Sequence, residues 1–122
     1  MSVIKKFWAA SHTAASPTGR RVYVNCPRIE CADGFTMSVQ ASEGHYCSPR
    51  LYVEDGDYSA WEIGFPSEQE DLIMKWAEKP GEPTETVYGW VPTGVIDAVI
   101  EKHGDLSSAL ADRLASLKTE DV

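Results

Sequence analysis

Three cysteines and one histidine in the first half of the chain have side chains of the kind that bind metals or act as nucleophiles. They are Cys26, Cys31, His45 and Cys47. Tetrahedral zinc is held by four ligands of these types. The pattern C-x4-C-x13-H-x-C, however, lacks the two-residue separation that is common in zinc-binding cysteine pairs. We therefore expect neither a metal nor another cofactor, and we keep a small metal- or thiol-dependent protein centred on these residues as an alternative.

One of these cysteines has a base close to it in the sequence. Cys47 lies two residues after His45, and Arg50 follows shortly. A thiolate nucleophile needs such a cation or base, and residues two apart on an extended chain project to the same face. No third residue that would orient the histidine can be recognised, so we expect no catalytic residue.

Acidic side chains are concentrated in the middle of the chain. The window 51–74 contains seven acids and no Lys or Arg. Acid–base catalysis needs a carboxylate with a shifted pKa in a pocket, whereas turns and helix starts leave carboxylates solvated. The turn Asp55-Gly56-Asp57 also lacks the further spaced ligands of a calcium loop. We predict instead that two acidic clusters contact a partner, namely Glu54, Asp55 and Asp57, and Glu68, Glu70 and Asp71.

The net charge of −8 is unevenly distributed. Residues 1–29 hold five bases and no acid, and residues 30–122 hold all 19 acids and carry a net charge of −13. Such a body repels nucleic acids and membrane surfaces and attracts a basic protein surface. The five bases near the N-terminus either contact phosphates or clamp the acidic body of the same chain or of a neighbouring one. We expect no direct contact with nucleic acid and no membrane association.

Four Trp and five Tyr make the chain rich in large aromatic residues. Trp61, Trp76 and Trp90 fall on apolar positions of predicted elements, so a place in the core explains them. Trp8 and Tyr46 have no such explanation, and aromatic residues near acids are typical anchors of protein interfaces. Protein recognition is therefore the functional class that the sequence favours.

These side chains are positioned by a series of predicted strands. Strands are expected at residues 20–25, 35–41, 51–53, 59–65 and 85–91, the last with apolar residues on both faces and therefore central. Asp33-Gly34 predicts a hairpin in front of the second strand. A three-residue loop, 32–34, would pair Ile29 with Met37 and Cys31 with Phe35, because cross-strand partners share a face.

Three helices complete the pattern. Ser67 and Glu70 form a capping box for the first, whose buried stripe contains Leu72, Ile73, Trp76 and Ala77. The second opens at Pro92-Thr93 and ends at Gly104. The third, residues 106–118, is amphipathic and packs on the sheet or on a second copy of the chain, which leaves a homodimer open.

The predicted fold class is α+β. We expect a mostly antiparallel sheet of about four to five strands with two to three helices, in the order β-β-β-β-α-β-α-α. Residues 1–19 would form a basic N-terminal arm, and residues 20–122 a single domain.

Four stretches of sequence form a recognisable combination. They are DGFTMSVQA (33–41) with YCSPR (46–50), EIGFPSE (62–68) and TETVYGWVP (84–92). This combination, within about residues 31–104, resembles small accessory proteins encoded by tailed bacteriophages and prophages. No catalytic motif comes with that group, so the resemblance implies no site residue.

What the resemblance implies is a phage origin. Small acidic phage proteins without catalytic motifs are often inhibitors of host defence, anti-CRISPR proteins among them. The N-terminus lacks the apolar core and cleavage site of a signal peptide. We therefore expect a non-enzymatic protein of the host cytoplasm that binds and inhibits a basic host protein, with a phage assembly role as a further alternative.

Overall fold

The computed structural model describes residues 2–15 and 22–120, with the side chains of 116–120 left out. The fold class is α+β, as predicted, and the order of strands and helices roughly matches the expectation. The helices are α1 (Val3–Ser11), α2 (Thr93–Lys102), α3 (Ser108–Glu120) and the short 3-10 helix η1 (Met74–Trp76). The strands are β1 (Thr13–Ala15), β2 (Tyr23–Asn25), β3 (Ile29–Glu30), β4 (Thr36–Gln40), β5 (Ala60–Gly64) and β6 (Val87–Pro92).

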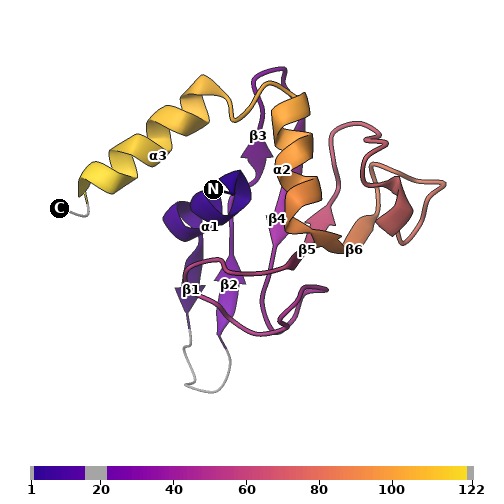
Figure 1. Ribbon diagram of the computed structural model, residues 1–122, viewed down its shortest axis with the longest axis horizontal. Coiled ribbons are helices and arrows are strands. Elements are labelled where there is room, and N and C mark those ends of the chain that lie inside the picture. Colours follow the sequence, from indigo (N-terminus) through magenta and orange to yellow (C-terminus); the bar gives the residue numbers. More distant parts are fainter. Residues whose placement is uncertain (1, 16–21, 121–122) are drawn as a thin grey trace.

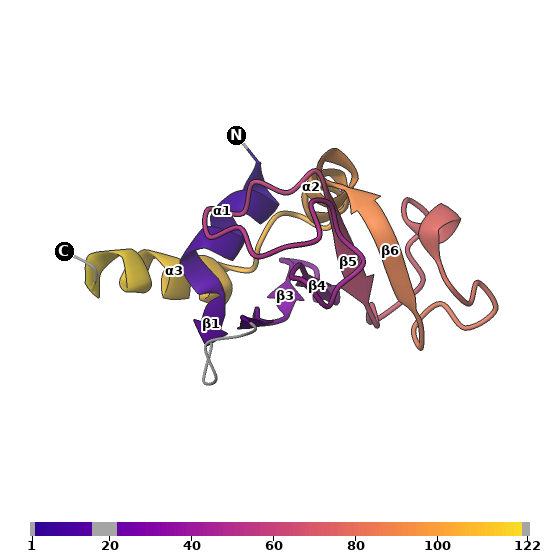
Figure 2. The ribbon, with the colours of Figure 1, turned by 90° about the horizontal axis from the view of Figure 1, so that it is seen from below.

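Four strands form an antiparallel sheet in the order β3-β4-β5-β6, and β1 pairs with β2 in a separate antiparallel ribbon. Helices α1 and α2 lie over one face of the larger sheet, and α3 extends away from it (Figures 1 and 2). Buried residues alternate with half-buried ones along β4, so one face of the sheet packs on the helices.

The hairpin between β3 and β4 has the predicted register. Ile29 pairs with Met37, and the Cys31 amide donates to the carbonyl of Phe35 over 2.8 Å. Gly34 has φ of +94°, a left-handed conformation that suits glycine. The three-residue loop is therefore confirmed, and it buries both Cys31 and Phe35.

The first residues are not an arm outside the domain. Residues 3–11 form α1, capped by the Ser2 hydroxyl, which accepts from the Lys5 amide. Ile4, Phe7 and Trp8 are fully buried. The predicted division at residue 19 is therefore wrong for the described residues 2–15, because the apolar face of α1 is part of the core. Residues 16–21, which include two of the five N-terminal bases, lie outside the described part.

The helix predicted from Ser67 does not form. Residues 67–86 make turns around η1, and Leu72 is exposed, although Ile73 is fully buried as expected. The Ser67 hydroxyl accepts from the Thr36 amide over 2.9 Å, and the Ser67 amide donates to the Thr36 carbonyl over 2.8 Å. Ser67 is therefore held against β4 in place of capping a helix.

Two predicted strands also differ. Residues 51–53 form no strand, and Leu51 is exposed. Strand β6 lies at the edge of the sheet. The sequence predicted a central strand, because residues 85–91 are apolar on both faces. The turns that precede β6 in the chain cover part of this edge, because the Glu78 amide donates to the Val87 carbonyl over 3.0 Å.

The two C-terminal helices follow the sequence pattern closely. Helix α2 ends before Gly104, which has φ of +87°, and it buries Ile96, Val99 and Ile100. Helix α3 begins at Ser108, two residues later than predicted, and the Ser107 hydroxyl accepts from the Leu110 amide. In the described part of the chain, no helix has the length and apolar composition of a membrane span.

Candidate functional site

The four metal-type residues do not form a site. Cys26, Cys31 and Cys47 are free thiols in the core. Among the described residues, no three or more His, Cys, Asp or Glu side chains are grouped so that they could hold a metal ion. The metal and thiol alternative therefore has no geometric support.

The environment of the thiols disfavours the thiolate. Burial raises the pKa of Cys26 to about 12 and that of Cys31 to about 11, the latter also through Asp33 and other nearby acids. Burial likewise raises the pKa of Cys47, whose Sγ donates to the carbonyl of Ser42 at 3.2 Å. His45 contacts the Ser42 hydroxyl at 2.6 Å, and burial lowers its pKa. The Cys47–His45 pair therefore lacks the properties of an activated nucleophile.

The first acidic cluster is a turn held against α1. The Asp55 carboxylate accepts from the Asp57 amide, and Asp57 forms an ion pair of 2.9 Å with Lys5. Glu54 and Asp55 are exposed and form no ion pair within the described residues. Glu54 and Asp55 are thus available to a partner, whereas Asp57 is already paired by one of the N-terminal bases.

The second acidic cluster is divided between surface and interior. Glu68 and Asp71 are exposed, but Glu70 is only 1% exposed. Its carboxylate contacts Nε2 of His103 at 2.8 Å and Nζ of Lys102 at 2.9 Å. Glu70 is therefore wrongly predicted as a partner-binding residue, because its charge is used inside the fold.

His103 lies between two carboxylates. Its Nδ1 is 2.6 Å from Asp33, its Nε2 faces Glu70, and its ring stacks on Phe35 with centroids 4.1 Å apart. Burial disfavours the imidazolium, but the hydrogen bonds to the two carboxylates outweigh it and raise the pKa of His103. Burial opposes ionisation of Glu70 too, yet hydrogen bonds from Leu72, Lys102 and His103 lower its pKa. This network joins the hairpin, the 67–73 turn and the end of α2.

Three aromatic residues surround an open groove beside β6. Tyr46 and Trp90 stack with ring centroids 5.0 Å apart, and they remain 38% and 50% exposed. Trp76, Glu78, Val87 and Gly89 complete the lining of this groove, which has a volume of about 410 Å³. We call it the Tyr46–Trp90 groove. Core packing does not explain aromatic side chains that stack on each other and stay exposed over a hollow. Such side chains are typical of binding sites.

A β-bulge places Trp90 in this groove. Ile63 pairs with Tyr88 and Trp61 with Val91, so two residues of β6 lie opposite the single residue Glu62. Trp90 has φ of +54° and projects out of the core, while Tyr88 and Val91 are buried. The predicted core position of Trp90 is therefore wrong.

Tyr46 is held over β6 by its backbone. Its amide donates to the Glu62 carboxylate over 2.8 Å, and its carbonyl accepts from the Trp90 amide over 2.9 Å. A Cβ at Gly89 would lie 3.2 Å from Cβ of Tyr46, so the missing side chain allows this close approach. The expected exposure of Tyr46 is confirmed, but that of Trp8 is not, because Trp8 packs against Tyr58 and Trp61 in the core.

Sequence reasoning missed Trp76, Glu78 and Trp90 as site residues. The signal that was present is Gly89, since a glycine inside a strand pattern often marks a bulge or a close approach of another segment. Glu78 carries no recognisable signal, because its position depends on how the irregular 67–86 segment folds back on β6.

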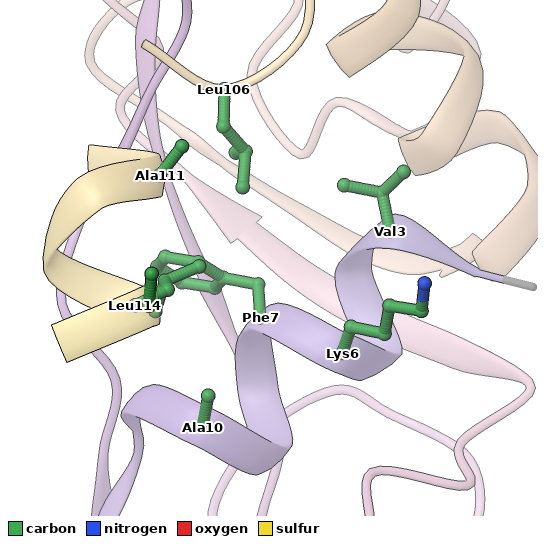
Figure 3. A pocket seen from close by; sticks show the side chains of 8 residues that line it. Val3, Lys6, Phe7, Ala10, Leu106, Ala111 and Leu114 are labelled. Atoms are coloured by element: carbon green, nitrogen blue, oxygen red, sulfur yellow. The ribbon is translucent and has the colours of Figure 1, made fainter. Parts of the chain in front are cut away.

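A second hollow lies between α1 and α3. Val3, Phe7 and Ala10 of α1 face Leu106, Ala111 and Leu114, with Lys6 at the side (Figure 3). The hollow is apolar and has a volume of about 280 Å³. Leu117, which belongs to the amphipathic helix predicted over residues 106–118, is outside the described side chains. Among the described residues that line this hollow, Lys6 has the one titratable side chain.

Comparisons of the chain with protein-family models, with curated proteins and with solved structures find no match.

Proposed function

We propose that this protein binds a basic region of another protein and inhibits it without catalysis. The observation that carries the proposal is the Tyr46–Trp90 groove, in which two stacked rings stay 38% and 50% exposed. Aromatic anchors of this kind contribute much of the binding free energy of protein interfaces. The buried thiols, whose pKa values are raised, support a role that involves no nucleophile.

The charge supports a basic partner. The chain carries a net charge of −8, and the exposed acids Glu54, Asp55, Glu68 and Asp71 are free of internal ion pairs among the described residues. Complementary charge mainly accelerates association and selects the partner.

A nucleic-acid-handling defence complex of the host cytoplasm, such as a CRISPR effector, is the partner we propose. Its basic nucleic-acid channel is complementary to an acidic protein. The phage origin expected from the stretches at 33–50, 62–68 and 84–92 is part of the same proposal.

Inhibition of DNA cleavage by purified, guide-loaded CRISPR effectors tests this function. We expect dose-dependent inhibition that weakens between about 50 mM and about 300 mM salt, because charge screening shortens the reach of the acids. A variant neutralised at the four free acids should inhibit at least roughly tenfold more weakly. The test substitutions are Glu54→Gln, Asp55→Asn, Glu68→Gln and Asp71→Asn.

A matched control loses the same charge elsewhere on the surface. Its substitutions are Glu30→Gln, Glu82→Gln, Glu101→Gln and Asp112→Asn, all at exposed positions. Inhibition that is equal in both variants, or that ignores salt, would reject the electrostatic proposal. No inhibition of any effector would reject the defence complex as the partner.

A homodimeric assembly protein is the second candidate function. The apolar hollow between α1 and α3 favours it, because a second copy of α3 could cover these side chains. Light scattering decides this: a mass of 13.5 kDa at high concentration would exclude it.

A further inference from the structure

We infer that the Tyr46–Trp90 groove receives an arginine side chain of the partner protein, between the ring of Trp90 and the carboxylate of Glu78. This inference rests on the proposed function and makes it specific. It names the group on the partner that the groove recognises.

Two rings of the groove already bind cations of this chain. The guanidinium of Arg50 lies 5.4 Å from the ring centroid of Tyr46, and Nζ of Lys75 lies 5.0 Å from that of Trp76. An ammonium or guanidinium group within about 6 Å of a ring centroid is attracted by the electrons of the ring face. The surroundings of the groove therefore suit cation–ring contacts.

The third ring lacks such a contact. Within the part of the chain that the structure describes, Trp90 stacks on Tyr46 but has no cation over it. Glu78 is also a lining residue of the groove, and in the same part of the chain its carboxylate forms no ion pair. An open aromatic face and an unpaired carboxylate thus line the same hollow.

Arginine is the natural side chain that satisfies both groups together. Its guanidinium is flat and weakly hydrated, so it stacks on an aromatic ring, and its N–H groups donate to a carboxylate in the same plane. A phosphate or a nucleotide would bring negative charge toward Glu78 and a chain of net charge −8. The net charge of the chain, rather than the local charge beside Arg50 and Lys75, therefore favours arginine over a stacked nucleotide.

Hydrogen bonds hold the backbone on both sides of the groove. The Tyr46 backbone is fixed at both its amide and its carbonyl, and the Glu78 amide is bonded to Val87. The backbone around the groove therefore loses little conformational entropy on binding, which preserves affinity for a single side chain.

Titration of the full-length, ¹⁵N-labelled protein with the peptide acetyl-Gly-Arg-Gly-amide tests the inference. We expect the indole N–H signals of Trp90 and Trp76 to shift. Those of Trp8 and Trp61 are internal controls, because their N–H groups are hydrogen-bonded in the core to the Val53 carbonyl and the Thr93 hydroxyl. The same peptide with citrulline in place of arginine keeps the shape without the charge and should shift them little.

Variants give the second measurement. Trp90→Leu and Glu78→Gln should each raise the dissociation constant of the arginine peptide by about two- to fivefold or more. Glu82→Gln removes one exposed acid of the irregular 67–86 segment that does not line the groove. This variant should leave the dissociation constant of the arginine peptide unchanged. These side chains are exposed, so the folded spectrum should persist in all three.

Equal binding of the citrulline peptide, or tighter binding of adenosine monophosphate, would overturn the inference. So would shifts that appear at Trp8 and Trp61 alone. Failure of the arginine peptide with intact, acid-dependent inhibition of an effector would remove only this inference. Arginine binding at the groove with no effector inhibited would instead remove the proposed function.

Discussion

His103 has a carboxylate at each ring nitrogen, so its protonation is coupled to stability. Its pKa is raised in the folded protein above the usual 6.5, so its stabilising contribution is fully present below that pH. The contribution is lost as pH rises through the folded-state pKa. Asp33 and Glu70 have lowered pKa values, so their contributions are lost at acid pH instead.

We predict that His103→Gln destabilises the protein more at about pH 6 than at about pH 9. The loss at the lower pH should be about 2 kcal/mol, because Glu70 keeps the Leu72 amide and Lys102 but has a weaker neutral donor in place of the imidazolium. Urea unfolding of both proteins at the two pH values measures it. If the loss of unfolding free energy caused by His103→Gln is larger at the higher pH, His103 is neutral in the folded protein.

The thiols give a second prediction for single residues. Because all three are buried and their pKa values are raised, a thiol reagent at about pH 8 should label the native protein slowly. In denaturant all three should react at once. One fast-reacting thiol in the native protein, mapped to Cys47, would instead revive a thiol-dependent function.

At the scale of elements, local signals explain what the sequence predicted well. The β3–β4 register follows from Asp33-Gly34 and from the alternation of residues 35–41, both of which act over a few residues. Helix α2 likewise follows from its own apolar spacing and from Gly104. Such elements can be predicted because neighbouring residues determine them.

The helix expected at residue 67 fails for the opposite reason. Ser67 and Glu70 have the types and spacing of a capping box, but their partners Thr36, Lys102 and His103 are distant in sequence. The bulge in β6 could not be predicted either. It shifts the alternation of buried and exposed residues along the strand, so that Trp90 points outward. The aromatic groove could not be found from periodicity for this reason.

Substitutions at Glu70 and Glu68 test whether Glu70 is a buried ion-pair residue or a surface residue of a capping box. If Glu70 is a buried ion-pair residue, Glu70→Gln should cost about 2–3 kcal/mol of stability, whereas Glu68→Gln should change it by less than about 0.5 kcal/mol. Chemical denaturation measures both. Equal, small effects would indicate a surface role for Glu70, as the capping box predicts.

At the scale of the whole molecule, α1 is a core element. Trp8 contacts Tyr58, Trp61 and His12, and its indole donates to the Val53 carbonyl. Gly56 fits beneath it, since a Cβ there would lie 2.7 Å from the Trp8 ring. The acidic turn at 54–57 is thus positioned by the N-terminal helix.

We predict that Trp8→Ala costs about 3–5 kcal/mol, as for other buried tryptophans. Lys5→Ala, which removes only the exposed pair with Asp57, should cost about 1 kcal/mol or less. Thermal or urea unfolding compares the two. A small effect of Trp8→Ala would restore the idea of a separate N-terminal arm.

The position of α1 also bears on synthesis, because the ribosome makes this helix before the segments that it packs against. Its partners come much later: Val53 lies 45 residues after Trp8, and Asp97, which accepts from the Ile4 amide, lies 93 residues after Ile4. The nascent helix therefore has an unburied apolar face until α2 has emerged. The domain can complete its core only after α2 has emerged, and a truncated chain that stops before α2 would expose Phe7 and Trp8 to aggregation.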